Sequence, residues 1–191
     1  MSTEFVCPSR IRVEDVVTAI RLAKPPAGVT VRVIAVDGPG GAGKTAFAER
    51  LGNALEAPVI HTDDFGDWDG PIEWGPALID EVLRPLASGT RVRFRPSAWG
   101  GPQRNEVVVE PVDYVILEGV TASRAAFRPY LAYSIWIQAP RELRLRRGLE
   151  RDGLEARTKW EAWMAAEDRY IETEHPADRA DLVIPGNASF A

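Results

Sequence analysis

One glycine-rich segment constrains this chain more strongly than any other feature of its sequence. Residues 38–45 read GPGGAGKT and fit the pattern G-x-x-x-x-G-K-[ST] at every defined position. A β-branched run at 29–36 precedes the segment, and a helical pattern at 44–55 follows it. Glycines at such a junction let successive backbone N–H groups point into one concavity and let phosphate oxygens approach closely. The sequence therefore predicts a phosphate-binding loop, in preference to a glycine-rich turn that binds nothing.

The side chains and the backbone of this loop have separate predicted roles. The Lys44 ammonium would reach the β- and γ-phosphates of a nucleotide, and the Thr45 hydroxyl would ligate Mg²⁺. The positive end of the helix that begins near Lys44 adds to the attraction for phosphate. ATP and Mg²⁺ are therefore the expected cofactors. The expected contacts in the loop are Gly38, Gly40, Gly41, Ala42, Gly43, Lys44, Thr45 and Ala46.

Composition limits the partners of the chain. Its 191 residues include 23 basic and 28 acidic side chains, which argues against nucleic acid or an anionic membrane as a partner. The single cysteine, Cys7, can form no intrachain disulfide, and two histidines with one cysteine supply no Cys/His zinc site. No apolar run has the length of a membrane span, and the first ten residues lack a signal-peptide pattern. We expect a cytoplasmic protein that binds phosphate locally.

Predicted strands and helices alternate along the chain, which is typical of an α/β fold with a mostly parallel sheet. With the phosphate-binding loop, this order predicts a three-layer α/β/α P-loop fold in one domain spanning residues 1–191. The predicted strands are 29–36, 59–61, 114–117, 134–138 and 182–184, with a hairpin from 91–95 and 106–109. The predicted helices are 11–24, 44–55, 77–87, 122–131 and two charged helices within 141–172.

The loop establishes nucleotide binding, and the rest of the sequence narrows the reaction. Large motor and AAA-type machines need a longer chain than this one. Guanine-specific switch proteins carry an Asn-Lys-x-Asp base reader, which this sequence lacks. The length fits a small kinase.

Acidic residues follow the predicted strands at the edge where ligands of such sheets bind. Asp63 would accept the proton of an attacking hydroxyl or hold Mg²⁺, whereas Asp64 would contact substrate or merely cap a turn. Glu118 ends a strand near the expected metal, which it would hold together with Thr45 and Asp63, or it would only anchor a loop. Asp37, expected just outside its strand, has a predicted structural role.

A stripe of arginines lies at helical spacing in the first charged helix. Its members would stabilise the transferring phosphoryl group, or they would form a solvated face paired with Glu142, Glu150, Asp152 and Glu155. Gly153, between the two charged helices, would let the segment move as a lid. The four arginines of the stripe are Arg141, Arg144, Arg147 and Arg151.

These features together resemble the uridine kinase and phosphoribulokinase-like family of P-loop kinases, in particular its shorter actinobacterial members. The resemblance covers roughly residues 34–187. It rests on the loop at 38–45, DDF at 63–65, LEG at 117–119, the arginine segment at 144–152 and ADLVIPG at 180–186.

By this resemblance the chain comprises a leading helix and connection at 1–28, an acceptor-site insertion at 62–111 and lid helices at 140–172. The resemblance also implies roles for single residues. Asp63 would be the general base, and Arg147 and Arg151 would contact phosphate from the lid. The nucleotide would also meet Arg144, Pro185 and Asn187, and the acceptor would meet Asp63, Asp64, Phe65, Trp74, Trp99 and Glu118.

The sequence departs from the family mainly in the acceptor segments. Gly66 stands where uridine kinases place a tyrosine, and Gly148 replaces one arginine of the lid signature. Residues 73–76 and 96–99 replace Phe-Asp-His-Pro and Pro-x-Tyr-Asp motifs. Three tryptophans in these segments would stack on a planar substrate or form ordinary core. They are Trp68, Trp74 and Trp99.

The sequence thus favours an ATP-dependent phosphotransferase that phosphorylates a small molecule, with a nucleoside as the favoured acceptor. A kinase of a sugar, vitamin or antibiotic is one alternative, and a nucleotide-binding regulator that phosphorylates nothing is another. The expected partners are a nucleotide and the acceptor, and a homo-oligomer is compatible with the sequence. Trp160, Trp163 and Met164 are assigned to packing, and His61 and His175 have no partner that the sequence reveals.

Overall fold

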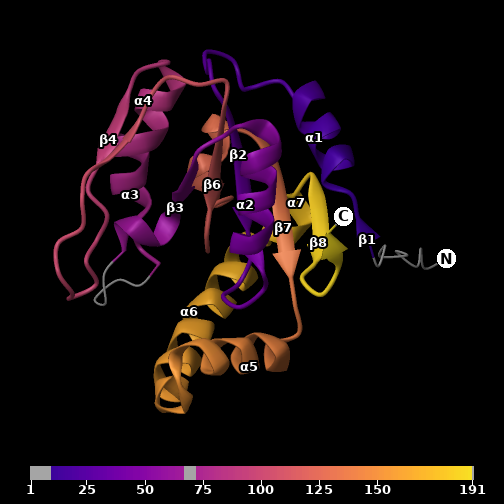
Figure 1. Cartoon of the computed structure of the whole chain (residues 1–191), viewed down its shortest axis with the longest axis vertical. Coiled ribbons are helices and arrows are strands. Elements are labelled where there is room, and N and C mark those ends of the chain that lie inside the picture. The colour runs from indigo at the N-terminus through magenta and orange to yellow at the C-terminus, as the bar shows by residue number, and fades with distance from the viewer. Residues whose placement is uncertain (1–9, 67–71, 191) are drawn as a thin grey trace.

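A five-stranded parallel sheet forms the centre of the protein in the computed structural model, which describes residues 10–66 and 72–190 (Figure 1). Every neighbouring pair of strands in this sheet is parallel, as the alternation of strands and helices predicts. β2 includes Asp37, so this residue ends the strand and does not follow it. The order across the sheet is β3 (Val59–His61), β6 (Tyr114–Glu118), β2 (Arg32–Asp37), β7 (Leu131–Gln138) and β8 (Leu182–Pro185).

Helices cover both faces of the sheet because its strands are apolar on both sides. Ile34 and Val36 of β2 pack against α1 (Val13–Leu22) and α2 (Lys44–Leu55). Val33 and Ala35, which point to the opposite face, belong to a second cluster. That cluster includes side chains from α3 (Gly75–Leu78), η2 (Ile79–Leu83), α4 (Arg84–Ala87), η3 (Ala125–Tyr130) and α6 (Arg157–Glu174). The result is the predicted three-layer α/β/α arrangement.

Two predicted helices take a different form in the structure. The stretch predicted at 77–87 begins at Gly75 and contains the π-helical turn η2, next to Pro85, which has no N–H to donate to the preceding turn. The helix predicted at 122–131 is the shorter 3₁₀ helix η3, which contains Pro129. The predicted hairpin is confirmed by antiparallel β4 (Val92–Phe94) and β5 (Val107–Val109).

The two charged helices lie beyond the carboxyl ends of the sheet strands (Figure 1). α5 (Arg141–Asp152) is separated from α6 by Gly153, at φ 92°, and by η4 (Leu154–Ala156). The remaining elements are η1 (Thr62–Phe65), α7 (Pro176–Arg179) and a parallel pair formed by β1 (Arg10–Ile11) and β9 (Ser189–Phe190). In residues 10–66 and 72–190, no helix is both long and apolar enough to cross a membrane.

Candidate functional site

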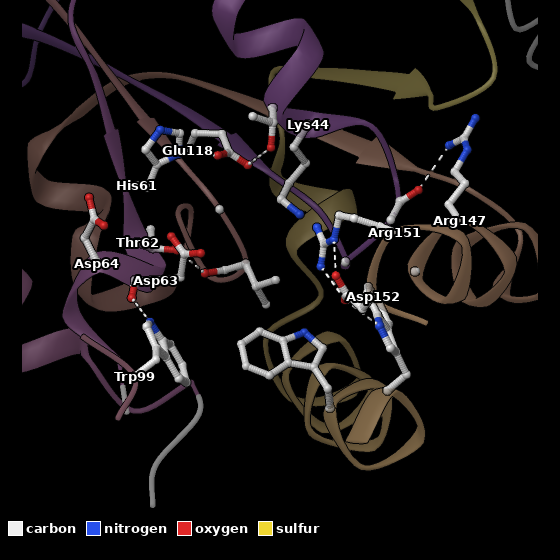
Figure 2. Close-up of a pocket in the computed structure, with 18 of the residues that line it drawn as sticks. Lys44, His61, Thr62, Asp63, Asp64, Trp99, Glu118, Arg147, Arg151 and Asp152 are labelled. Carbon is white, nitrogen blue, oxygen red and sulfur yellow. Dashed lines mark hydrogen bonds and ion pairs between the residues drawn. The ribbon is translucent and has the colours of Figure 1, made fainter. Parts of the chain in front are cut away.

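A cavity of about 980 Å³ opens at the carboxyl edge of the sheet. Its wall combines the loop before α2, the start of η1, the end of β6 and the charged helices α5 and α6. Figure 2 shows Lys44 and Arg151 extending into the space that Asp63 borders. The sequence-predicted residues on the wall are Gly40, Gly41, Gly43, Lys44, Thr45, Ala46, Asp63, Asp64, Trp74, Trp99, Glu118, Arg147 and Arg151.

The glycine-rich loop has the local geometry that its motif predicts. A Cβ on Gly38, at φ 144°, would lie 2.1 Å from the Ile137 carbonyl oxygen, so this position accepts only glycine. Gly43 adopts the left-handed conformation and is the N-cap of α2. Lys44 is buried, and its Nζ donates to the Pro39 carbonyl oxygen at 3.1 Å. The loop therefore closes on its own lysine, next to the positive end of α2.

Asp37, the last residue of β2, holds the start of this loop in place. Its Oδ1 accepts the Gly38 N–H at 2.6 Å, and its Oδ2 accepts the hydroxyl of Tyr170 at 2.7 Å. Ser123 donates to the same Oδ2 through both its N–H and its hydroxyl. Asp37 is completely buried, and this network fits the structural role predicted for it.

Glu118 links the loop to a histidine that sequence reasoning left without a role. The Thr45 hydroxyl donates to Glu118 Oε1 at 3.4 Å, and His61 Nδ1 lies 2.7 Å from Glu118 Oε2. This hydrogen bond raises the pKa of His61 above its ordinary value, although burial of the ring acts in the opposite direction. The parallel register of β3 and β6 places His61 opposite Glu118. Only strand pairing reveals this contact, because 57 residues separate the two side chains.

The adjacent acids Asp63 and Asp64 have different surroundings. Asp63 is exposed toward the cavity, where partial withdrawal from water raises its pKa and the charge of Glu118 raises it further. Asp64 is buried and forms an ion pair with Arg104, a partner that the sequence did not indicate. Its neighbour Phe65 packs on Phe94, with ring centroids 4.7 Å apart. Asp63 is therefore the acid that is free to meet a ligand.

The oxygen donors near the loop fit a magnesium ion. Thr45 and Glu118 present a hydroxyl and a carboxylate within 3.4 Å of each other, and Asp63 faces the same cavity. The described residues contain no group of three His, Cys, Asp or Glu side chains arranged to hold a metal. Mg²⁺ usually takes one or two protein oxygens and completes its coordination with water and substrate phosphates. The donor set is of that kind.

Three tryptophans line the cavity, namely Trp74, Trp99 and Trp163. We call them the acceptor wall, because the sequence predicts acceptor contacts at Trp74 and Trp99. The ring centroid of Trp163 lies 6.3 Å from that of Trp74 and 6.2 Å from that of Trp99. Trp99 donates its indole N–H to the Asp63 carbonyl oxygen at 2.9 Å. Trp163, assigned to packing from the sequence, is thus part of the cavity, and so is Trp160. Trp68, the remaining predicted stacking residue, lies outside the described residues.

Of the four arginines of the stripe, Arg147 and Arg151 belong to the cavity wall. Arg147 donates to the carbonyl oxygens of Gly41 and Gly186, at 3.0 and 3.2 Å. Arg151 pairs with Asp152 at 2.7 Å, and its guanidinium lies 5.5 Å from the Trp160 ring centroid. Both cations therefore line the cavity, and protein groups hold them in this structure.

The other two arginines of the stripe lie away from the cavity. Arg141 pairs with Asp168 at 2.5 Å, and the buried Arg144 pairs with Glu167 at 3.1 Å. Arg144 was predicted to contact the nucleotide, but it is buried and does not line the cavity. Among the described residues, the cavity lining also leaves out four further predicted contacts and the first glycine of the loop, namely Ala42, Phe65, Pro185, Asn187 and Gly38.

The similarity of this chain to known proteins lies in its structure. No protein-family model matches the sequence, and no curated protein matches it. A possible uridine kinase from Bacillus stearothermophilus has a TM-score of 0.68 and 20% identity over 90% of this chain and 96% of that one. A "putative fructose transport system kinase" from Silicibacter sp. TM1040 has a TM-score of 0.69 and 18% identity over 92% and 100%. D-glycerate 3-kinase from Cryptococcus neoformans has a TM-score of 0.55 and 13% identity over 93% and 94%.

Sequence identities of 13 to 20% make this a likeness of fold. The similar structures cover 90 to 93% of this chain. Their likeness agrees, at the level of the fold, with the resemblance to the uridine kinase and phosphoribulokinase-like family. The chain therefore has the fold of the P-loop kinase-like proteins.

Proposed function

We propose that this protein is an ATP- and Mg²⁺-dependent kinase that transfers the γ-phosphoryl group to a hydroxyl of a small molecule. One observation carries the proposal: the Lys44 ammonium, from the start of α2, and the Asp63 carboxylate, from η1, border one cavity. Phosphoryl transfer needs a cation at the phosphates and an acid at the incoming hydroxyl. The likeness to kinase structures supports the fold that this chemistry requires.

Four charged groups on the wall, together with Thr45, have a role in this reaction. Asp63 accepts the proton of the acceptor hydroxyl while the hydroxyl oxygen forms a bond to the γ-phosphorus. ADP leaves with the electrons of the broken P–O bond. The raised pKa of Asp63 makes its carboxylate a better base. Lys44 and Arg151 neutralise charge on the phosphates. Thr45 and Glu118 would hold Mg²⁺, which supplies further neutralisation of phosphate charge when bound.

The acceptor wall favours a nucleoside as the molecule that is phosphorylated. Trp74, Trp99 and Trp163 present aromatic surface within the same cavity as Asp63, and such surface stacks on a planar base. A sugar hydroxyl attached to that base would then approach Asp63. Sugars and sugar acids, which have no planar ring, are the competing class of acceptor.

The experiment that tests this function is ADP production from ATP and Mg²⁺ with uridine, cytidine, fructose, glycerate and a vitamin panel. We expect turnover with a nucleoside and a loss of kcat of about 10²–10⁴-fold in Asp63→Asn, since a general base contributes that much. Asp64→Asn is the matched control, because it removes an adjacent charge that is buried against Arg104. Asp64→Asn should lower the Tm, and it should reduce kcat far less than Asp63→Asn does. Full turnover in Asp63→Asn would contradict the proposed role of Asp63, and no turnover with any acceptor would favour a nucleotide-binding regulator.

A further inference from the structure

A fully buried carboxylate lies behind the cavity, between the glycine-rich loop and the acceptor wall. Glu167 of α6 has no exposed surface. Its Oε1 accepts the backbone N–H of Gly40 at 2.7 Å and the indole N–H of Trp163 at 2.5 Å. Its Oε2 accepts Nη1 of Arg144 at 3.1 Å. One carboxylate oxygen therefore joins a loop residue to a residue of the acceptor wall.

Glycine at position 40 of the loop makes room for this contact. Gly40 occupies a position that the motif G-x-x-x-x-G-K-[ST] leaves open, so phosphate binding alone does not require glycine there. In the structure, a Cβ at this position would lie 3.0 Å from Glu167 Oε1 and 3.2 Å from Cζ3 of Trp160. Glycine permits the carboxylate to approach the loop closely, which a larger residue would oppose.

The contact is more than an anchor for α6. Tyr170, one turn further along α6, already ties this helix to the loop through Asp37, which accepts the Gly38 N–H. The Glu167 link differs because both residues that share Oε1, Gly40 and Trp163, line the cavity. It connects the nucleotide side of the cavity with the acceptor side through two hydrogen bonds.

Because Glu167 is charged, the effect of this connection on the loop depends on the donors that surround the carboxylate. Burial raises the pKa of Glu167, whereas the Gly40 N–H, Lys44, Arg144 and the Trp163 indole lower it. A carboxylate so close to the loop opposes the binding of phosphate unless these donors compensate its charge. Loss of the Trp163 donor leaves more uncompensated negative charge at Gly40. We expect weaker nucleotide binding as a consequence.

We propose that Glu167 is a positioning residue that couples the acceptor wall to the glycine-rich loop. A ligand that changes the hydrogen bond of Trp163 would change the affinity of the loop for nucleotide, and nucleotide would change the affinity for that ligand by the same factor. This inference rests on the proposed function, because it takes the loop to bind nucleotide and Trp163 to face the acceptor.

The test is a double-mutant cycle in the full chain, with the affinity for ADP and Mg²⁺ measured by titration calorimetry. Trp163→Phe keeps an aromatic ring and removes the indole N–H. Glu167→Gln keeps the size of the side chain and removes its charge. We expect Trp163→Phe to weaken ADP binding at least about fivefold in the wild-type background. We expect it to have no effect in the Glu167→Gln background, because the carboxylate through which Trp163 acts is absent.

A spectroscopic readout separates coupling from a purely structural role. The indole N–H resonance of Trp163, assigned by its loss in Trp163→Phe, should move when ADP binds to the wild type and should not move in Glu167→Gln. Trp136→Phe is the matched control, because Trp136 of β7 belongs to the core and does not line the cavity. Trp136→Phe should leave the affinity for ADP unchanged.

The outcomes distinguish failure of the inference from failure of the proposed function. Normal ADP binding by Trp163→Phe, or equal effects of this substitution in both backgrounds, overturns the coupling and leaves the kinase function intact. No ADP binding by the wild type overturns both. If Glu167→Gln does not fold, the ADP affinity of Trp163→Phe and the response of the Trp163 resonance in the wild type still decide, since failure of either contradicts the coupling.

Discussion

The two sides of the cavity are built in different ways. On the loop side, residues 38–46 are contiguous in sequence, and backbone N–H groups, one lysine and the start of α2 form the site. On the other side, the acceptor wall brings Trp74, Trp99 and Trp163 together from three separate segments. The loop is therefore specified locally, whereas the acceptor wall exists only when the whole chain is folded.

This difference predicts that substitutions on the two sides fail in different ways. In the proposed reaction the loop would bind phosphate, which every nucleotide carries, so the loss of a single charge there should affect the reaction with every acceptor. The acceptor wall depends on how large side chains fit against glycines such as Gly66. Changes there should alter packing and acceptor binding, and the loop should still bind nucleotide unless the change removes the hydrogen bond from Trp163 to Glu167.

Between the loop and the acceptor wall, the larger expected effect belongs to the loop side. Lys44→Met removes the buried ammonium, and we expect kcat to fall by about 10²–10³-fold because charge developing on the phosphates loses its nearest cation. Steady-state kinetics with the best acceptor of the screen measure the effect. Lys24→Met, which removes the same charge from an exposed position, should retain wild-type kinetics. Retained activity in Lys44→Met would remove the contrast between the two sides.

The next effect concerns the packing of α5 against α6. A Cβ on Gly148 would lie 2.3 Å from Cε2 of Trp160, so Gly148→Ala should displace the indole. Alanine favours a helix by about 1 kcal/mol over glycine, but the overlap should outweigh this gain and destabilise the protein by about 1–3 kcal/mol. Denaturant unfolding provides the measurement. Trp160→Leu in the same chain should relieve much of the loss, and additive losses would rule out this contact as the cause.

A smaller effect is expected where the acceptor wall meets η1. Gly66 has φ −92°, so its backbone conformation suits any residue, but a Cβ would lie 2.6 Å from Cζ2 of Trp99 and 2.7 Å from Cε3 of Trp74. Gly66→Ala should separate the two rings and raise the KM for the acceptor roughly tenfold, as for one misplaced methyl group in an apolar pocket. The affinity for ADP should not change. Equal losses of acceptor and ADP affinity would show that the two sides are not separable here.

The smallest effect is a pH dependence at the end of α5. The Arg151 guanidinium holds the pKa of Asp152 below its ordinary value, and the Trp160 indole N–H acts in the same direction. The stability from this contact is therefore present above the ordinary pKa of aspartate and is lost as the pH falls through the lowered value. Asp152→Asn should lower stability by roughly 0.2–1 kcal/mol near neutral pH and by nothing in strong acid. Thermal unfolding of the wild type and of Asp152→Asn from neutral pH to strong acid measures the difference in stability. A difference that persists in strong acid would refute the ion pair as its cause.

Much of the fold could be predicted because its signals are local. The β-branched run before the loop, the period of α2 and the hairpin at β4 and β5 all appear where their patterns indicate. The helix predicted at 122–131 is shorter, because Pro129 and local 3₁₀ geometry replace an α-helix there. Periodicity places an element well, but proline chemistry and tertiary packing set its type and its ends.

The site was predictable only in part, for the same reason. Asp63 and Glu118 follow predicted strands, and the topology of parallel sheets brings strand ends together. His61 opposite Glu118 requires the register of β3 and β6, and the pair of Asp64 with Arg104 spans 40 residues. Arg144 and Arg147 lie three residues apart on one helix, yet one is buried against Glu167 and the other lines the cavity.

The sequence by itself determined the glycine-rich loop, its place between a strand and a helix, and the alternation that makes a parallel sheet. These depend on backbone conformation and on hydrophobic period, which neighbouring residues set. The tertiary structure decided which of the adjacent acids Asp63 and Asp64 is exposed, which arginines line the cavity, and how Glu167 joins Gly40 to Trp163. These depend on burial and on contacts between distant segments, which exist only once the sheet has brought those segments together.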